Sequence, residues 1–418
     1  MTQSSRLPAV LAPLTSPAYR RLLWSSALWW QTLSMWTVVA GVLVLDMTDS
    51  ALAVTLLTFW RRAAQLLLGS FAGPISDRLG RRTTLLVTQG TIFLSCAGVL
   101  MLFAGDRLAA WQVTVAAFAI GAAWTVDMPA RTALTPDLVG RAQTADAMLV
   151  ESFAQGLLGS IGAYAGGWLL ERHGPGVSLS VMLGLTGANL AILWLFSRQE
   201  VARTVAVGGQ SLWSALGEGV RYVARTPTIL AVTLVSITLN VLIFPSMSLL
   251  PVFARDVLGW GPAGLGLLSS GYSLGTFVGL YIVLRLRPFA SIGLLFTVGA
   301  LLECAALVVF AASSSFALSW AMLFVAGLGQ AGFHTLRSTI LLTTSSDEMR
   351  GRALSTVVLT QGAGLPGELQ TGLLAERIGA PGTVGMQAGV SALLTAVVAI
   401  ALPVLWRGNT KKVGTTDT

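Results

Sequence analysis

Residues 73–82 read Gly-Pro-Ile-Ser-Asp-Arg-Leu-Gly-Arg-Arg, and the stretches on both sides, roughly 51–72 and 83–104, are long and predominantly apolar. A bilayer core takes about 20 apolar residues per helix. Two apolar helices joined by a short charged segment predict a helical hairpin in a membrane, with residues 73–82 as its loop. The same alternation of long apolar stretches and short polar segments continues along the chain.

Composition places the chain among polytopic membrane proteins. Of its 418 residues, 54% are hydrophobic and only 11% are charged, and the mean hydropathy is +0.75. About 400 residues suffice for twelve membrane helices with short loops. We therefore predict an all-α membrane protein with twelve transmembrane helices, at roughly 22–45, 51–72, 83–104, 108–128, 147–169, 177–197, 228–250, 264–284, 289–310, 316–336, 353–375 and 383–405.

The basic residues predict the orientation of these helices. If the N-terminus is inside, most of the 26 Lys and Arg residues fall in inner segments. Both termini are then cytoplasmic by the positive-inside rule. Because the net charge of +8 follows topology, we expect the lipid bilayer as partner and no nucleic acid. The first 20 residues contain no apolar core, so no cleavable signal peptide is expected. The predicted outer segments hold only four arginines, Arg107, Arg172, Arg255 and Arg377.

The sequence contains no pattern of a catalytic or metal-binding site. Its two cysteines, Cys96 and Cys304, lie in apolar stretches. Its two histidines, His173 and His334, are not accompanied by a nucleophile, metal-ligand or phosphate-loop motif. We expect no enzymatic activity, no metal and no cofactor.

An internal repeat predicts the domain organisation. Residues 69–73 match 275–279, and residues 167–174 match 372–379, at an offset of about 205 or 206. Such repeats are common in transporters. We predict an N-terminal six-helix bundle in residues 1–197 and a C-terminal bundle with a short basic tail in residues 228–418. Residues 198–227 form a predicted cytoplasmic linker, whose amphipathic helix has Leu212, Leu216, Val220 and Val223 on one face.

The spacing Gly-x-x-x-Asp-Arg-x-Gly-Arg-Arg in residues 73–82 resembles the signature loop of the major facilitator superfamily. Residues 19–24, 49–54, 127–139 and 249–259 resemble the exporter branch that includes the enterobactin exporter and drug exporters. This resemblance spans about residues 17–405. It implies the major facilitator fold, with two bundles that rock about a central cavity, and a multi-pass protein of a bacterial cell membrane, expected as a monomer.

Two positions depart from that branch. Its first span usually carries Gly-Asp-Trp, whereas this chain has Ser34, Met35 and Trp36, so the membrane carboxylate is missing. Its antiporter members often carry Gly-Pro-x-x-Gly-Gly on the fifth span, whereas residues 162–167 keep the glycines and lack the proline. Both departures weaken the inference of antiport.

By resemblance, residues 73–82 form a conformational latch. Asp77 would face the inner start of the eleventh span, and Arg81 would reach Asp127 on the fourth span. Such bonds would hold the cytoplasmic side shut in the outward-facing state. The predicted latch residues are Gly73, Asp77, Arg78, Gly80, Arg81 and Asp127.

Charged residues inside predicted spans are candidates for coupling and gating, because burial in a membrane makes them costly. Arg61 and Arg62 lie on the second span, and Glu368 lies at a similar depth on the eleventh. We expect Glu368 to pair with Arg61 or Arg62 in one conformation, and we expect protonation or substrate binding to break the pair. The alternative is that the ion pair is static or that the arginines snorkel to the membrane surface. Glu303, on the ninth span, is a candidate for proton handling.

The family resemblance places the first, fourth, seventh and tenth spans around the substrate. Aromatic faces with few polar groups would suit bulky amphipathic or planar ligands. Simple packing is the alternative for each candidate. The predicted cavity residues are Trp29, Gln31, Trp36, Trp124, Asn240, Phe244, Gln330 and His334.

The predicted function is a secondary transporter that exports small amphipathic organic molecules, drug-like or siderophore-like, by proton antiport and alternating access. An uptake symporter and an uncoupled facilitator are alternatives, and the missing carboxylate at Met35 makes the facilitator credible. A non-transporting membrane scaffold is an alternative of another class. Such a protein would be expected to have lost the charges of the signature loop, whereas this chain keeps them.

Overall fold

The computed structural model describes residues 9–195, 223, 225–344 and 360–403, and within these ranges it contains helices and no strands. Ten described helical segments are long and apolar enough to cross a membrane. The predicted all-α membrane fold is confirmed. Most of the predicted linker, residues 198–227, lies outside the described residues.

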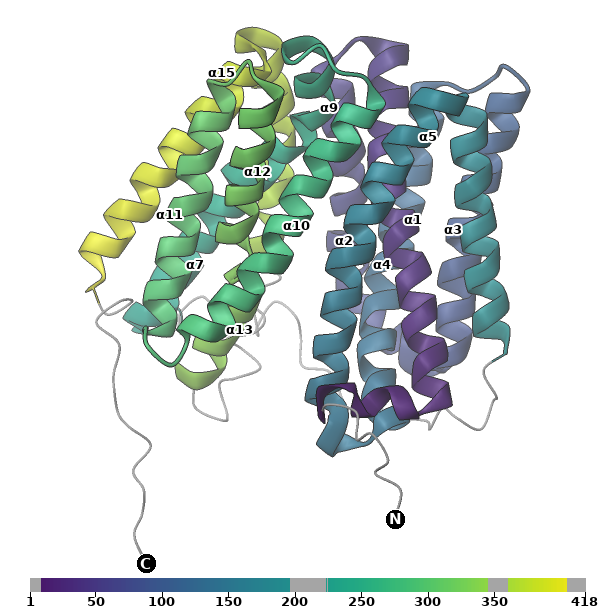
Figure 1. Cartoon of the computed structure of the whole chain (residues 1–418), viewed down its shortest axis with the longest axis horizontal. Helices are drawn as coiled ribbons and strands as arrows, with labels where there is room; N and C mark the ends of the chain where they lie inside the picture. Colours follow the sequence, from purple (N-terminus) through teal and green to yellow (C-terminus); the bar gives the residue numbers. More distant parts are fainter. Residues whose placement is uncertain (1–8, 196–222, 224, 345–359, 404–418) are drawn as a thin grey trace, which may run out of the picture. The chain divides into compact units, whose positions relative to one another are not determined.

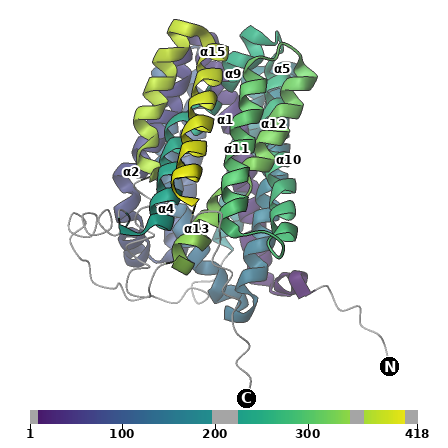
Figure 2. The same cartoon turned by 90° about the vertical axis from the view of Figure 1, so that its left-hand side faces the viewer.

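The N-terminal half consists of long helices that run alongside one another (Figures 1 and 2). A short 3-10 helix, Ala9–Thr15, precedes them. Helix α1 packs along α5, and α2 packs along α4. The bounds are α1 Pro17–Thr48, α2 Ala51–Leu79, α3 Arg81–Ala104, α4 Ala110–Val139 and α5 Thr144–Trp194, with the 3-10 turn Arg141–Gln143 before α5.

Serine caps explain where the first two helices begin. Ser16 Oγ accepts a hydrogen bond from the Tyr19 amide at the start of α1, and Ser50 Oγ accepts one from Ala53 at the start of α2. Such caps satisfy amides that have no partner within the helix. Asp49 joins the two helices in the left-handed conformation, with φ 49°, which Asp adopts more readily than most residues.

The turn between α2 and α3 is shorter than predicted. Residues 73–79 continue α2 to Leu79, and α3 begins at Arg81, so Gly80 alone separates the helices. Gly80 has φ 78°, which glycine adopts without a Cβ clash. The prediction of residues 73–82 as a loop is therefore wrong, although the predicted hairpin is present.

Residues 227–257 of the C-terminal half form an irregular span. Prolines at positions 245 and 251 lack the amide that a regular helix needs. The span changes between α-helical, 3-10 and π-helical turns: α7 Pro227–Thr238, η4 Leu239–Ile243, α8 Phe244–Ser246, η5 Met247–Leu249, α9 Leu250–Val252 and η6 Phe253–Val257. The later helices are α10 Pro262–Leu286, α11 Ile292–Ala311, α12 Phe316–Gln330, α13 Phe333–Thr344 and α15 Gly364–Ala401.

Two of the long helices are each two helices joined at a glycine. Gly174 in α5 has φ 78° and ψ 177°, and Gly379 in α15 has φ 74° and ψ 164°. These glycines occupy matching positions in the sequence repeat, so the backbone supports the repeat there. Each join falls between two of the predicted spans, and the total of twelve stays a prediction.

Contacts divide the chain into two units. The first unit contains Met1–Gly208, Ser248–Ser273 and Glu368–Ala380, and the second contains Gly209–Met247, Leu274–Gly367 and Pro381–Thr418. The first unit thus includes short segments from the C-terminal half. The domain boundaries at residues 197 and 228 stay a prediction.

Candidate functional site

Charged side chains meet near the middle of α2 in the first unit. Arg62 Nε lies 2.9 Å from Glu368 Oε1 on α15, and Ser248 Oγ donates a hydrogen bond to Glu368 Oε2 at 3.0 Å. The Glu368 side chain is fully buried. The sequence left Arg61 and Arg62 as alternative partners, and the structure places Arg62 against Glu368. We name Arg61, Arg62, Ser248 and Glu368 the mid-membrane cluster.

The depth of this cluster makes its charges costly. Arg61 and Arg62 lie about ten residues inside α2, which corresponds to about 15 Å from its start at about 1.5 Å per residue. Glu368 lies about eleven residues before the Gly379 turn. With a hydrocarbon core about 30 Å thick that begins at these helix ends, we expect both positions near its centre. A charge there needs a partner or water.

Arg61 differs from Arg62 in its surroundings. Its stem packs against α4, where a Cβ added to Gly121 would lie 2.9 Å from Arg61 Cγ. Glu368 attracts Arg61 electrostatically, but within the described part of the chain Arg61 forms no ion pair or hydrogen bond. The cluster therefore contains two guanidinium groups and one carboxylate.

A second polar group lies inside the N-terminal helices around Asp127 and Arg131 of α4, which form a buried ion pair one turn apart. Thr88 Oγ1 and Gln89 Nε2 donate to Asp127 Oδ1 at 2.6 and 2.9 Å. Arg131 Nη1 donates to Ser25 Oγ at 2.9 Å. Each charge is thus paired and hydrogen-bonded, as burial requires.

The hydrogen bonds of this group close a ring through four helices. Asn189 Nδ2 of α5 donates to Gln89 Oε1 at 2.9 Å, and Ser25 Oγ of α1 donates to Asn189 Oδ1 at 2.5 Å. A branch runs from Arg131 through Ser26 to Glu151, which accepts from Ser26 Oγ at 2.9 Å. We name this group, which ties α1, α3, α4 and α5 together, the Asp127 network.

The predicted latch has a different partner from the one expected. Arg81 forms an ion pair with Asp137, and its Nη1 also donates to the Ala133 carbonyl at 2.7 Å. Asp127 is held instead by the Asp127 network, so the expected contact between Arg81 and Asp127 is wrong. Helix α4 carries Asp137 near its C-terminal end, whereas Asp127 lies well inside the helix.

The remaining latch residues are only partly described. Gly80 forms the turn itself, and Arg78 is exposed. The surroundings of Gly73 and the side chain of Asp77 lie outside the described part, as does the segment 345–359, which contains the start of the predicted eleventh span. Their latch role stays a prediction.

Among the predicted cavity residues of the first unit, the described contacts of Trp29 and Trp36 are packing contacts. Both are buried and line a void of only about 10 Å³, and the Arg131 guanidinium lies 5.5 Å from the Trp29 ring centre. Gln31 and Trp124 are partly buried. The Trp124 indole N–H has no hydrogen-bond partner among the described residues.

The predicted residues of the second unit have mixed surroundings. Asn240 is buried, and its amide donates to the Ser236 carbonyl at 2.8 Å. Phe244 packs edge-on against Phe333 with ring centres 5.3 Å apart. Gln330 is partly buried, and the His334 side chain is not described. Glu303 is fully buried on α11 where α12 approaches at Gly329.

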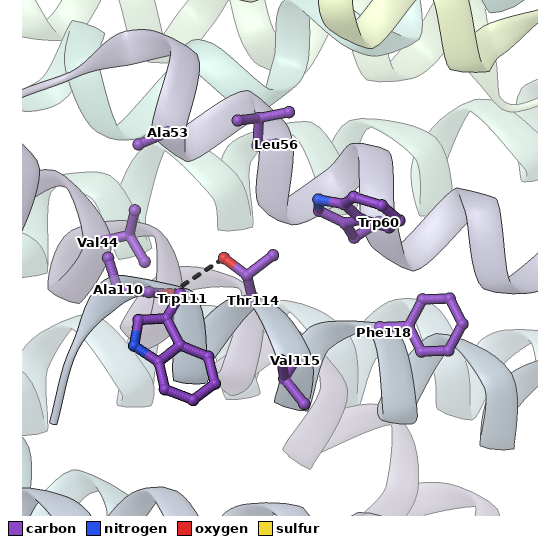
Figure 3. Close-up of a pocket in the computed structure, with 9 residues that line it drawn as sticks. All are labelled: Val44, Ala53, Leu56, Trp60, Ala110, Trp111, Thr114, Val115 and Phe118. Carbon is purple, nitrogen blue, oxygen red and sulfur yellow. Dashed lines mark hydrogen bonds between the residues drawn. The ribbon is translucent and has the colours of Figure 1, made fainter.

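An apolar pocket of about 590 Å³ lies between α2 and α4, near the N-terminal ends of both helices. Trp60 and Phe118 of these helices form an edge-on pair at one end of it (Figure 3). The Thr114 hydroxyl donates to the Ala110 carbonyl at 3.0 Å, so it adds little polarity. The pocket suits an acyl chain or the apolar part of an amphipathic molecule, and none of the predicted cavity residues lines it.

Sequence reasoning missed a charged cluster where α1 meets α2. Arg255 of η6 forms an ion pair with Asp49, and its Nη1 donates to the Leu45 carbonyl at 3.4 Å. Ser50 Oγ donates to Glu376 Oε1 at 2.7 Å. Residues 49–54 and 249–259 both resemble stretches of the exporter branch. That shared signal could have suggested that the two stretches touch.

Comparison with known proteins places these sites in a transporter fold. The model of the transmembrane secretion effector family matches residues 8–413. No curated protein matches the chain. Among solved structures, a peptide transporter POT mutant in complex with sulfate has a TM-score of 0.74 at 11% identity, covering 94% of this chain and 95% of its own.

Two further solved structures have the same fold. A mutant of the nucleoside transporter NupG has a TM-score of 0.73 at 13% identity, covering 93% of this chain and 99% of its own. A bacterial homolog to the human lysosomal transporter Spinster, inward-facing and unoccupied, has a TM-score of 0.66 at 16% identity, covering 93% and 95%. At these identities the likeness shows the fold alone.

Proposed function

Because this chain belongs to the transmembrane secretion effector family and is a multi-pass membrane transporter of the major facilitator type, we propose that it exports small amphipathic organic molecules by proton antiport. Family membership makes it a transport protein and not an enzyme. The proposal adds direction, substrate class and coupling, and it takes the cell membrane of a bacterium as the location and a monomer as the working unit.

The observation that carries the proposal is the ion pair between Arg62 and Glu368 near the centre of the predicted bilayer. A buried carboxylate that loses its charge on protonation no longer holds Arg62, so proton binding and the position of α2 relative to α15 are linked. Such an element couples a proton to a conformational step. The apolar pocket of about 590 Å³ has a size in the range of ligand pockets and suits the apolar part of an amphipathic cargo. Trp60, Trp111 and Val115 of its lining are exposed, so a lipid chain is an alternative occupant.

An uncoupled facilitator is a second candidate, which the position of Met35 favours. The side chain is buried and packs beside Gly166, where a Cβ would lie 2.9 Å from Met35 Cγ. The exporter branch that the sequence resembles usually carries a carboxylate at this position. If Glu368 does not replace that carboxylate in function, the protein moves its substrate without protons.

An efflux panel separates these functions. Cells stripped of their own exporters would be loaded with ethidium, rhodamine 6G, Nile red or carboxyfluorescein, with and without an uncoupler. We expect faster efflux of at least one dye than in cells with an empty vector, and loss of that efflux on uncoupling. Efflux that resists the uncoupler would indicate a facilitator, and accumulation would indicate uptake. Efflux equal to the empty vector for every dye would contradict export of this class.

A further inference from the structure

Arg61 and Arg62 are consecutive residues with the same chemistry and different partners. Arg62 has the Glu368 carboxylate at 2.9 Å. The other oxygen of that carboxylate accepts from Ser248. Arg61 has no direct partner among the described residues. Within the described residues, two guanidinium groups therefore share one carboxylate, and Arg61 is the one without a direct contact to it.

The position of Arg61 is fixed by packing. The absence of a side chain at Gly121 lets α2 approach α4 at this point, since an added Cβ would lie against the Arg61 carbonyl and 2.9 Å from its Cγ. Arg61 is partly exposed as a residue, but its guanidinium lies in a strongly desolvated environment. A negative charge beside it would therefore be stabilising.

A second unused donor lies on the same side of α4. Trp124 follows Gly121 by three residues, about one turn, and residues at this spacing share a helix face. Its indole N–H is buried without a hydrogen-bond partner among the described residues. Arginine and the indole N–H can only donate hydrogen bonds. A group that satisfies both must be an acceptor, and one that also balances the charge must be an anion.

We propose that Arg61 binds an oxyanion, a carboxylate, sulfonate or phosphate group, of the molecule that the protein transports, with Trp124 as a second donor. Guanidinium groups bind oxyanions through charge-assisted hydrogen bonds. The inference rests on the proposed function for the statement that the anion is cargo. It narrows the cargo from amphipathic molecules in general to amphipathic acids.

Binding of matched probes tests the site without a transport assay. Full-length protein in phosphatidylcholine nanodiscs would be titrated with 2-naphthoate, 2-naphthalenesulfonate and the neutral 2-naphthamide. We expect the two anions to bind about tenfold more tightly than the amide, because a hydrogen bond to a charged group contributes about 1.5–3 kcal/mol. Arg61→Gln removes this preference, and Arg61→Lys keeps part of it.

The exposed Arg107 provides the matched control, and Arg107→Gln keeps the anion preference. Three results would overturn the proposal. The wild type could bind all three probes with equal affinity, or it could bind none of them. The third is an anion preference that survives Arg61→Gln in a protein whose unfolding temperature is unchanged. A preference lost only in phosphatidylglycerol nanodiscs would identify an anionic lipid headgroup as the occupant and overturn the assignment to cargo. If dye efflux fails while the anion preference holds, the proposed export falls and the site stands.

Discussion

The Asp127–Arg131 pair inside the Asp127 network and the mid-membrane cluster both hold arginine and carboxylate inside the first unit, and they differ in balance. The partly buried Glu151 joins that network only through Ser26. Asp127 and Arg131 form a neutral pair with hydrogen bonds to Thr88, Gln89 and Ser25; of the Arg131 nitrogens, only Nη2 is without a partner among the described residues. The mid-membrane cluster has two arginines and one carboxylate. A balanced, hydrogen-bonded pair stabilises the fold, whereas an unbalanced one is available for a proton or a ligand.

The largest expected effect is loss of the balanced pair. Arg131→Ala leaves Asp127 buried without its counter-ion, which costs about 3–5 kcal/mol of unfolding free energy. The double change Asp127→Leu with Arg131→Met removes both charges and recovers most of the loss. Thermal unfolding of the purified protein measures both. If the double variant is no more stable to unfolding than Arg131→Ala, the loss of stability is not caused by the unpaired charge of Asp127.

A smaller effect is expected at the contact that positions Arg61. In Gly121→Ala, the new Cβ meets the Arg61 carbonyl, and α2 must move away from α4. Such overpacking costs about 1–3 kcal/mol. Gly98 is the control, since a Cβ there meets nothing within 4 Å. We expect Gly98→Ala to leave the unfolding temperature unchanged or to raise it; equal losses in the two variants would contradict the close packing.

For the mid-membrane cluster, we expect substitutions to reduce transport and to leave the stability of the fold unchanged. Arg62→Gln removes the partner of Glu368, and we expect efflux of the best panel dye to fall about tenfold, a typical size for coupling between two conformational states. Arg62→Lys keeps the charge and most of the rate. Arg107→Gln measures the effect of removing an exposed arginine. Equal rates in Arg62→Gln and wild type would remove this residue from the mechanism.

The smallest effect is expected where Arg255 meets Asp49 at the end of α1. Both side chains are partly or largely exposed, so Asp49→Asn costs less than about 1 kcal/mol. Salt screens such pairs, and the difference from wild type narrows further at high ionic strength. Unfolding in low and high salt measures it. A larger loss of unfolding free energy that persists in high salt would show that this pair is shielded from solvent like the buried pairs.

The sequence was sufficient for the fold class and for the hairpin around residue 80, because hydrophobic length and charge position determine these. It could not choose between Arg61 and Arg62, since consecutive residues point about 100° apart on a helix and the rotation of α2 depends on packing at Gly121. The Asp127 network was missed because Ser25, Gln89 and Asn189 are far apart in sequence and share no period.

The central claim is that Glu368 couples protons to transport, and one comparison tests it most directly. Inside-out vesicles would carry wild type or Glu368→Gln, and the best panel dye would be followed in gradient-driven accumulation and in exchange without a gradient. We predict that Glu368→Gln loses accumulation and keeps exchange, because the amide still accepts from Ser248 and does not titrate. Accumulation by Glu368→Gln to the wild-type ratio would contradict the account.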